Sequence, residues 1–123
     1  MRIGFIGLGN VGGKLAGSLL RNCYDLTVRD LDREAARQFL DAGAAWADSP
    51  REMAEACDVV VTCLPSPAAC STAMEADDGL LAGLSAGKVW MEMSTEVNAF
   101  QVVSGSPSAI YRNPTVLTVI MVW

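Results

Sequence analysis

The sequence predicts an α/β fold with a doubly wound, mostly parallel β-sheet, and two observations carry this prediction. Strand-like and helix-like segments alternate from the first residue to about residue 93, which is typical of a parallel sheet with helices on both faces. A glycine pattern also sits between the first predicted strand and the first predicted helix. The 123 residues are 51% hydrophobic and 19% charged, so we expect one domain with a packed core.

The predicted elements follow in order along the chain. Apolar runs predict strands at residues 2–6, 24–29, 44–47 (a minor strand), 58–64 and 88–93. Helical patterns cover residues 11–21 and 32–40, and Gly43 is a stop signal for the second of these helices. Ser49 and Ser66 each precede a proline, which predicts two more helix starts. We expect residues 79–87 to be a loop and residues 116–123 to be a buried strand.

A glycine-rich loop follows the first predicted strand. Gly7, Gly9 and Gly12 form the pattern Gly-x-Gly-x-x-Gly, and the helical pattern begins at once after it. Such glycines permit the tight turn, the approach of backbone to a pyrophosphate, and close packing of helix and strand. The N–H groups of the helix N-terminus then face the anion. We therefore expect a Rossmann-type dinucleotide-binding domain whose cofactor-binding residues include Gly7, Leu8, Gly9, Asn10, Val11 and Gly12.

Asp30 is a further candidate cofactor-binding residue. It ends the strand-like run 24–29, about 20 residues after the glycines, where an acidic side chain binds the ribose hydroxyls of NAD. A carboxylate there repels the 2′-phosphate of NADP, so NAD is the expected cofactor and NADP is less favoured. Arg29 and Arg33 lie nearby and could relax this preference. Two alternatives stay open: Asp30 only opens the next helix, or the glycine loop is an ordinary turn that binds no nucleotide.

Composition excludes several classes of partner. The net charge is −5 and no basic patch is visible, which argues against nucleic acid and against an anionic membrane surface. No apolar segment approaches the ~20 residues that span a bilayer. The four cysteines form no Cys-x-x-Cys pair and the chain has no histidine, so no metal site is expected. Cys57 and Cys63 read as core residues, and reduced thiols favour an intracellular, cytoplasmic protein, with a mitochondrial location left open.

The opening residues resemble a known family. Residues 4–12, Gly-Phe-Ile-Gly-Leu-Gly-Asn-Val-Gly, are similar to the signature of the β-hydroxyacid dehydrogenases, which include 3-hydroxyisobutyrate dehydrogenase and 6-phosphogluconate dehydrogenase. Further similar segments follow in the family's order at residues 43–44, 49–50, 58–65 and 79–81. Residues 92–95 read Glu-Met-Ser-Thr where the family usually has Asp-x-Ser-Thr. The resemblance covers residues 1–95.

This resemblance implies roles for residues outside the glycine loop. Leu64, Pro65 and Ser66 would lie along the nicotinamide ribose, and Thr95 would lie near the nicotinamide. Ser94 would contact the substrate, a small hydroxy acid. Ser104 and Gly105 belong to a segment that looks like the family's substrate loop, which makes them candidate substrate-binding residues.

The pattern diverges in residues 96–123, which look internally shortened relative to the family. The family's helical second domain, which supplies the catalytic lysine, is expected to be absent, so residues 1–123 are predicted to form a single dinucleotide-binding domain. Neither Lys14 nor Lys88 is placed to act as the general acid. We therefore assign no catalytic residue in this chain and expect it to be inactive alone.

Two classes of function remain open. The first is the NAD(P)-binding domain of a 3-hydroxyisobutyrate dehydrogenase-like oxidoreductase, which transfers a hydride between NAD and a small 3-hydroxy acid once a helical domain completes it. The second is a non-catalytic NAD(H)-binding module or scaffold. In either case the apolar run 116–123 and the shortened segment before it predict self-association through exposed apolar surface.

Overall fold

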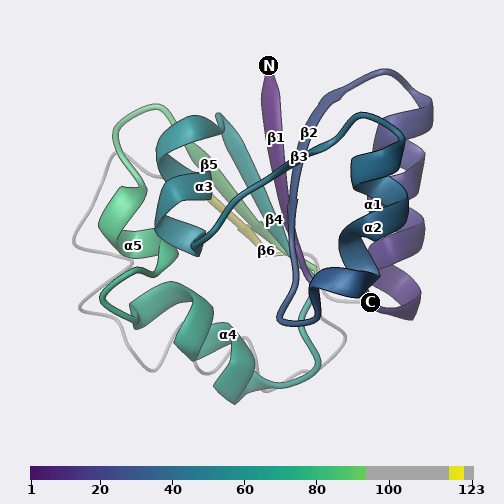
Figure 1. Ribbon diagram of the computed structural model, residues 1–123. Helices are drawn as coiled ribbons and strands as arrows, with labels where there is room; N and C mark the ends of the chain where they lie inside the picture. The colour runs from purple at the N-terminus through teal and green to yellow at the C-terminus, as the bar shows by residue number, and fades with distance from the viewer. Residues whose placement is uncertain (94–116, 121–123) are drawn as a thin grey trace.

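A six-stranded sheet with helices on both faces forms the molecule in the computed structural model, which describes residues 1–93 and 117–120 (Figure 1). The strands are β1 (Arg2–Ile6), β2 (Asp25–Arg29), β3 (Ala45–Trp46), β4 (Val59–Thr62), β5 (Val89–Glu92) and β6 (Leu117–Ile120). The helices are α1 (Asn10–Arg21), α2 (Arg33–Asp41), α3 (Pro50–Ala56), α4 (Pro67–Glu75) and α5 (Leu80–Gly83). The predicted α/β fold is therefore confirmed.

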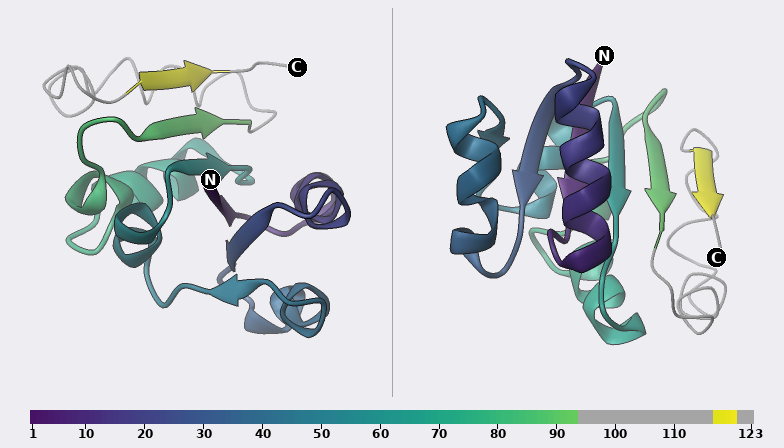
Figure 2. Two further views of the ribbon diagram at one scale, coloured as in Figure 1. Left: turned by 90° about the horizontal axis from the view of Figure 1, so that it is seen from above. Right: turned by 90° about the vertical axis from the view of Figure 1, so that its right-hand side faces the viewer.

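The sheet is doubly wound. Its strand order is β3-β2-β1-β4-β5-β6, and every neighbouring pair is parallel (Figure 2). The chain builds outward from β1 to β3, then returns to β4 on the other side of β1 and builds outward again. Ile6 lies in register with both Arg29 of β2 and Thr62 of β4. The carboxyl ends of three strands thus meet at the switch point, where such sheets bind ligands.

Two hydrophobic clusters lie on the two faces of the sheet. Helices α1 and α2 cover one face and contribute Ala16, Ala36 and Phe39 to its cluster. Helices α3, α4 and α5 cover the other face, where Met53, Met74 and Leu80 pack against Val60 and Trp90. Strands β1 and β4 are covered on both faces, which explains their almost uninterrupted apolar sequences.

The predicted helix starts at Ser49 and Ser66 are confirmed. The Ser49 hydroxyl accepts from the Glu52 N–H at 3.1 Å, and the Ser66 hydroxyl accepts from the Ala69 N–H at 3.2 Å. The Glu52 carboxylate in turn accepts from the Asp48 N–H at 2.7 Å, one residue before the cap. The predicted stop of α2 is also confirmed, since Gly43 has a φ of +104°.

One sequence expectation needs correction. Residues 79–87 were expected to be a loop, but they contain the short helix α5, whose Leu80 is fully buried. Gly83 of this helix lies so close to α3 that an added Cβ would overlap the Arg51 carbonyl oxygen, and local sequence does not reveal this tertiary contact. The strand predicted within residues 116–123 is confirmed over Leu117–Ile120, and its remaining residues lie outside the described part of the chain.

Several predicted site residues lie outside the described part of the chain. Residues 94–116 and 121–123 are not described, and they include Ser94, Thr95, Ser104 and Gly105. Within the described residues, no helix is both long and apolar enough to cross a membrane.

Candidate cofactor-binding site

In the glycine-rich loop, two glycines lie very close to a backbone carbonyl oxygen of another residue. Gly7 has a φ of +97°, and an added Cβ would overlap the carbonyl oxygen of Cys63. A Cβ on Gly12 would overlap the carbonyl oxygen of Gly7. Glycine is thus required at both positions for steric reasons within the protein itself.

Gly9 is different from the other two glycines. A Cβ built on it would meet no atom within 4 Å, and its φ of −67° suits any residue. Nothing in the described protein therefore requires glycine here. The space that Gly9 leaves open fits the approach of a ligand's phosphates to the backbone.

The N-terminus of α1 has no side-chain cap. Its N-cap residue is Gly9, whereas α2, α3 and α4 are capped by the side chains of Asp32, Ser49 and Ser66. The first N–H groups of a helix have no partner within the helix, and they carry the positive end of its dipole. Together with the open space at Gly9, this uncapped turn fits the pyrophosphate of a dinucleotide.

A cavity of about 690 Å³ lies beside this loop, at the carboxyl ends of β1, β2 and β4. Eight of the ten predicted cofactor-binding residues that the structure describes line it: Gly7, Gly9, Asn10, Val11, Gly12, Asp30, Leu64 and Pro65. Val11 is 44% exposed, so the first apolar position of α1 faces the cavity while Gly12 and Ala16 face the core. Leu8 and Ser66 do not line the cavity.

Asp30 connects the end of β2 to the glycine loop. Its Oδ2 accepts from the Leu8 N–H at 2.7 Å, and its Oδ1 accepts from the Asp32 N–H at 2.9 Å. The cap of α2 is Asp32, whose carboxylate accepts from the Glu34 N–H. Asp30 therefore does not simply open the next helix: it lines the cavity and fixes the loop.

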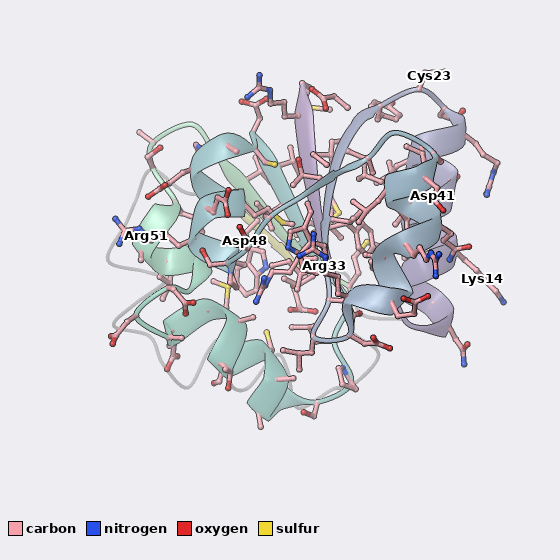
Figure 3. The ribbon with its side chains drawn as sticks, in the orientation of Figure 1. Lys14, Cys23, Arg33, Asp41, Asp48 and Arg51 are labelled. Carbon is pink, nitrogen blue, oxygen red and sulfur yellow. The ribbon has the colours of Figure 1, made fainter. Side chains whose placement is uncertain are left out.

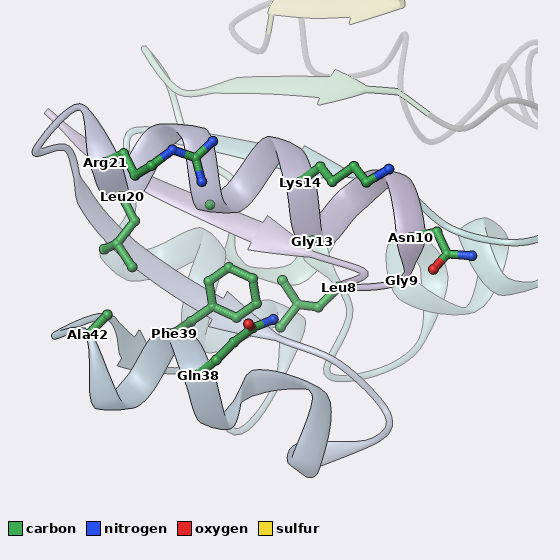
Figure 4. Close-up of a pocket in the computed structure, with 11 residues that line it drawn as sticks. Leu8, Gly9, Asn10, Gly13, Lys14, Leu20, Arg21, Gln38, Phe39 and Ala42 are labelled. Atoms are coloured by element: carbon green, nitrogen blue, oxygen red, sulfur yellow. The ribbon is translucent and has the colours of Figure 1, made fainter.

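The side chain of Leu8 points away from the cavity. It is buried on the other side of the loop, at the floor of a groove between α1 and α2 that also holds Phe39 (Figure 4). Its contribution to the cofactor site in this structure is its backbone N–H, which is bonded to Asp30.

The loop after β4 forms the opposite wall. Leu64 and Pro65 line the cavity, whereas Ser66 caps α4 with its hydroxyl. Cys63, read from the sequence as a core residue, is half-buried and lines the cavity, because β4 ends one residue before it. Its thiol donates to the Met93 carbonyl at 3.6 Å, and burial together with the charge of Glu92 raises the pKa of the Cys63 thiol.

Sequence reasoning missed the contribution of α4. Its small residues Ala69, Thr72 and Ala73, and its C-cap residue Ala76, line the cavity at the spacing of one helix face. This pattern of small side chains, directly after Leu64 and Pro65, was a readable signal. Because these side chains are small, this wall of the cavity leaves space between α4 and the end of β2.

Leu31 was also missed. It lines the cavity beside Asp30, and it is 98% exposed, which is unusual for a leucine. Its side chain offers an apolar surface at the end of the cavity where Asp30 would hold the ribose.

Two arginines lie near this end of the cavity, around Trp46. The guanidinium carbon of Arg33 lies 5.0 Å from the Trp46 ring centroid, and that of Arg29 lies 5.8 Å from it. Arg29 also donates to the carbonyl oxygens of Ala47 and Asp48, at 3.0 and 2.5 Å. Arg33 and Asp48 appear together near the centre of Figure 3.

A buried polar cluster lies behind the loop after β4. Glu92 is 2% exposed, and its Oε2 accepts from the Thr62 hydroxyl at 2.6 Å and from the Cys70 thiol at 3.0 Å. The Trp90 indole N–H donates to the Thr62 hydroxyl at 3.0 Å. From the sequence, Glu92 was noted only as a departure from the family's Asp-x-Ser-Thr pattern.

Neither lysine lines the cofactor cavity. Lys14 lies along the groove between α1 and α2 (Figure 4), and Lys88 donates to the carbonyl oxygens of Ala54 and Glu55 at the end of α3. Within residues 1–93 and 117–120, no group of three or more His, Cys, Asp or Glu side chains is arranged to hold a metal ion.

Comparison with known proteins agrees with this geometry. Residues 2–102 match the NAD binding domain of 6-phosphogluconate dehydrogenase. The chain is 38% identical over 95 residues to the uncharacterized oxidoreductase YfjR of Bacillus subtilis, with 77% of this chain and 33% of that protein covered. It is 34% identical over 93 residues to the mitochondrial 3-hydroxyisobutyrate dehydrogenase of Bos taurus, with 76% and 28% covered. The chain thus spans about a third of the length of the curated relatives that it matches.

A solved structure shows the same architecture together with a bound cofactor. Psf3 in complex with NADP+ and 2-OPP superposes with a TM-score of 0.83 at 28% identity, covering 94% of this chain and 40% of that one. The fold, the glycine loop and these relatives all indicate the same family. The chain belongs to the family of the NAD binding domain of 6-phosphogluconate dehydrogenase, and it is an NAD(P)-binding domain of the 3-hydroxyisobutyrate dehydrogenase-like oxidoreductases.

Proposed function

We propose that this domain prefers NAD and serves an oxidoreductase that transfers a hydride between NAD and a small 3-hydroxy acid. The observation that carries the preference is the position of Asp30, whose carboxylate lies at the cavity edge beside the glycine loop. A ribose with two free hydroxyls can donate to this carboxylate, whereas a 2′-phosphate meets a like charge.

The chain's own residues would bind and orient the cofactor. The uncapped first turn of α1 would hold the pyrophosphate, and Gly9 would let it approach. Leu64 and Pro65 would position the nicotinamide end, opposite the Asp30 end of the cavity. When bound, NAD supplies the hydride-accepting ring, and the protein supplies orientation and a restricted environment.

The substrate class is proposed from the relatives. The Bos taurus relative is a 3-hydroxyisobutyrate dehydrogenase, which supports a small 3-hydroxy acid as the substrate of the complete enzyme. Ser94, Ser104 and Gly105 remain the proposed substrate-binding residues, and Thr95 remains proposed near the nicotinamide. The proposal also assigns proton transfer to a group outside this chain, because neither lysine lines the cavity.

Calorimetry with NADH and NADPH tests the cofactor preference. We expect the unmutated chain to bind NADH at least roughly tenfold more tightly than NADPH, which corresponds to about 1.4 kcal/mol of repulsion. Asp30→Asn removes the charge but keeps an oxygen that can still accept from the Leu8 N–H. This variant should therefore reduce the difference between the NADH and NADPH affinities while the glycine loop stays bonded to residue 30.

Asp41→Asn is the matched control, because Asp41 is an exposed carboxylate at the end of α2 (Figure 3) and does not line the cavity. Like Asp30→Asn, it removes one negative charge from the chain, and it should leave the preference for NADH over NADPH unchanged. Tighter binding of NADPH than of NADH by the unmutated chain would overturn the proposed preference. Failure of the folded chain to bind either nucleotide would overturn the cofactor assignment itself.

A further inference from the structure

The loop that connects β4 to α4 is anchored at both ends to one atom of a neighbouring strand. Thr62 is the last residue of β4, and Cys70 lies in the second turn of α4. Both side chains donate to the same oxygen, Oε2 of Glu92, at 2.6 and 3.0 Å. Glu92 is the last residue of β5 and lies in register with Thr62.

The direction of the hydrogen bonds in this cluster is determined by Trp90. An indole N–H can only donate, so the Thr62 hydroxyl must accept from it. The single proton of that hydroxyl is then directed to Glu92. Oε2 therefore acts as an acceptor, and a carboxylate oxygen that accepts two hydrogen bonds is suited to this position.

Cys70 is held as a donor by its surroundings. It is fully buried, and burial together with the charge and hydrogen bond of Glu92 strongly raises the pKa of the Cys70 thiol. The thiol therefore keeps its proton at neutral pH and can donate it to Glu92 continuously. Thr62 and Glu92 are themselves 0% and 2% exposed, so water does not compete well for these bonds.

Each donor is the direct neighbour of a residue that lines the cofactor cavity. Cys63 follows Thr62, and Ala69 precedes Cys70. Between them run Leu64 and Pro65, which also line the cavity. A shift of either donor would therefore move the cavity wall, both at the loop and along the small-residue face of α4.

We infer that Glu92 is a positioning residue, which holds the β4–α4 loop and the first turns of α4 in the conformation that accepts the cofactor. This inference rests on the proposed function, because it concerns the same cavity. Burial of a carboxylate is costly unless it is well bonded, and here the bonds connect three elements around a binding site. The Thr62 hydroxyl and the Cys70 thiol act through Glu92 rather than by touching the cofactor.

Two matched pairs of variants test the inference through NADH affinity. Thr62→Val removes the hydroxyl and keeps the shape, whereas Thr62→Ser keeps the hydroxyl. Cys70→Ala removes the donor, whereas Cys70→Ser restores one. We expect Thr62→Val and Cys70→Ala each to weaken NADH binding by roughly tenfold or more, because each loses a hydrogen bond to a charged acceptor. The two serine variants should bind NADH within about threefold of the unmutated chain, as rescue by a donor requires.

Met74→Ala separates positioning from general stability. Met74 is 3% exposed and lies on α4, as Cys70 does. It packs in the hydrophobic cluster on the same face of the sheet and makes none of the hydrogen bonds to Glu92 described above. This variant should lower the thermal midpoint of unfolding, as loss of a buried side chain does. Its NADH affinity, measured well below that midpoint, should stay close to that of the unmutated chain.

The outcomes distinguish this inference from the proposed function. If the unmutated chain binds NADH but Thr62→Val and Cys70→Ala bind it equally well, the positioning role is wrong. The positioning role is equally wrong if Cys70→Ala and Cys70→Ser weaken NADH binding to the same extent. It is also wrong if Met74→Ala weakens NADH binding as much as Thr62→Val and Cys70→Ala do. If Thr62→Val does not fold, the Cys70 pair decides alone. If the unmutated, folded chain does not bind NADH, the proposed function itself fails.

Discussion

Leu8 and Asp30 are joined by a hydrogen bond of 2.7 Å from the backbone N–H of Leu8 to the Asp30 carboxylate, across 22 residues of sequence. The carboxylate that would bind the adenosine ribose thus also fixes the glycine loop to the end of β2. A substitution that removes both oxygens, such as Asp30→Ala, would disturb cofactor recognition and loop geometry together. This is why Asp30→Asn is the more informative variant for the cofactor preference.

The glycines of the loop should respond differently to substitution. Gly9→Val places a side chain in open space, so we expect a loss of stability of only about 1 kcal/mol from the poorer N-cap. The same side chain would occupy the space proposed for the pyrophosphate, so NADH binding should be lost. Calorimetry on the folded variant measures this, and equal NADH binding by Gly9→Val and the unmutated chain would contradict the proposed site.

Gly12→Ala is the companion variant and should show the opposite behaviour. Its Cβ would overlap the carbonyl oxygen of Gly7, which is backbone and cannot rotate away. We expect a loss of stability of about 3 kcal/mol, at the upper end of the cost of overpacking. Urea denaturation followed by circular dichroism measures it, and an unchanged midpoint would show that the turn tolerates a side chain.

Cys63 offers a chemical probe of the cavity. It lines the cavity, whereas Cys23 is exposed at the opposite end of the molecule from α4 (Figure 3). Saturating NADH should therefore slow alkylation of Cys63 by iodoacetamide and leave that of Cys23 unchanged, as measured by mass spectrometry of the labelled peptides. Identical labelling of Cys63 with and without NADH would argue against cofactor binding in this cavity.

The pH dependence of this labelling follows from the thiol pKa. The thiolate is the reactive form, and burial together with the charge of Glu92 raises the pKa of Cys63. Without NADH, Cys63 should therefore react more slowly than Cys23 at pH 8, and its rate should still rise at pH values above the usual thiol pKa of about 8.5. Faster labelling of Cys63 than of Cys23 at neutral pH would contradict the described burial of Cys63 beside the charge of Glu92.

Cys23→Gly should stabilise the protein. Cys23 has a φ of +62°, in the left-handed region that costs most residues roughly 1–2 kcal/mol. Glycine adopts this conformation freely but loses more backbone entropy on folding, so we expect a net gain of about 0.5–1 kcal/mol. Differential scanning calorimetry measures the shift, and Cys23→Ala is the control because it removes the thiol but keeps the strain. Equal midpoints for the two variants would refute this explanation.

Self-association remains a prediction, and the position of β6 supports it. In the described part of the chain β6 pairs with β5 alone, at the edge of the sheet (Figure 2). Residues 116–123 are almost entirely apolar, and an apolar edge strand is a template for pairing. We expect light scattering at about 0.1 mM to show a dimer or larger species, in the concentration range where exposed edges associate. Val119→Lys should shift the protein toward the monomer, and a monomeric unmutated chain would contradict the prediction.

The sequence predicted the strands, the glycine loop and Asp30 because each has a local signal. Gly7 and Gly12 are needed for backbone packing within a few residues of the turn, and this requirement leaves a fixed spacing. The buried Glu92 has no such signal, since its partners Thr62 and Cys70 come from other elements. Likewise, α5 packs closely against α3 at Gly83, and a pattern read along one segment cannot contain such a contact.

Among the residues that the structure describes, those that line the cofactor cavity fall between Ile6 and Asp78. Of the described residues after that point, α5 packs against α3, β5 and β6 extend one side of the sheet, and Glu92 supports the β4–α4 loop from behind. A change in β6 therefore leaves the described lining of the nucleotide pocket in place. A related protein that keeps residues 1–93 keeps this lining as a transferable unit, which can be joined to different substrate-recognising partners.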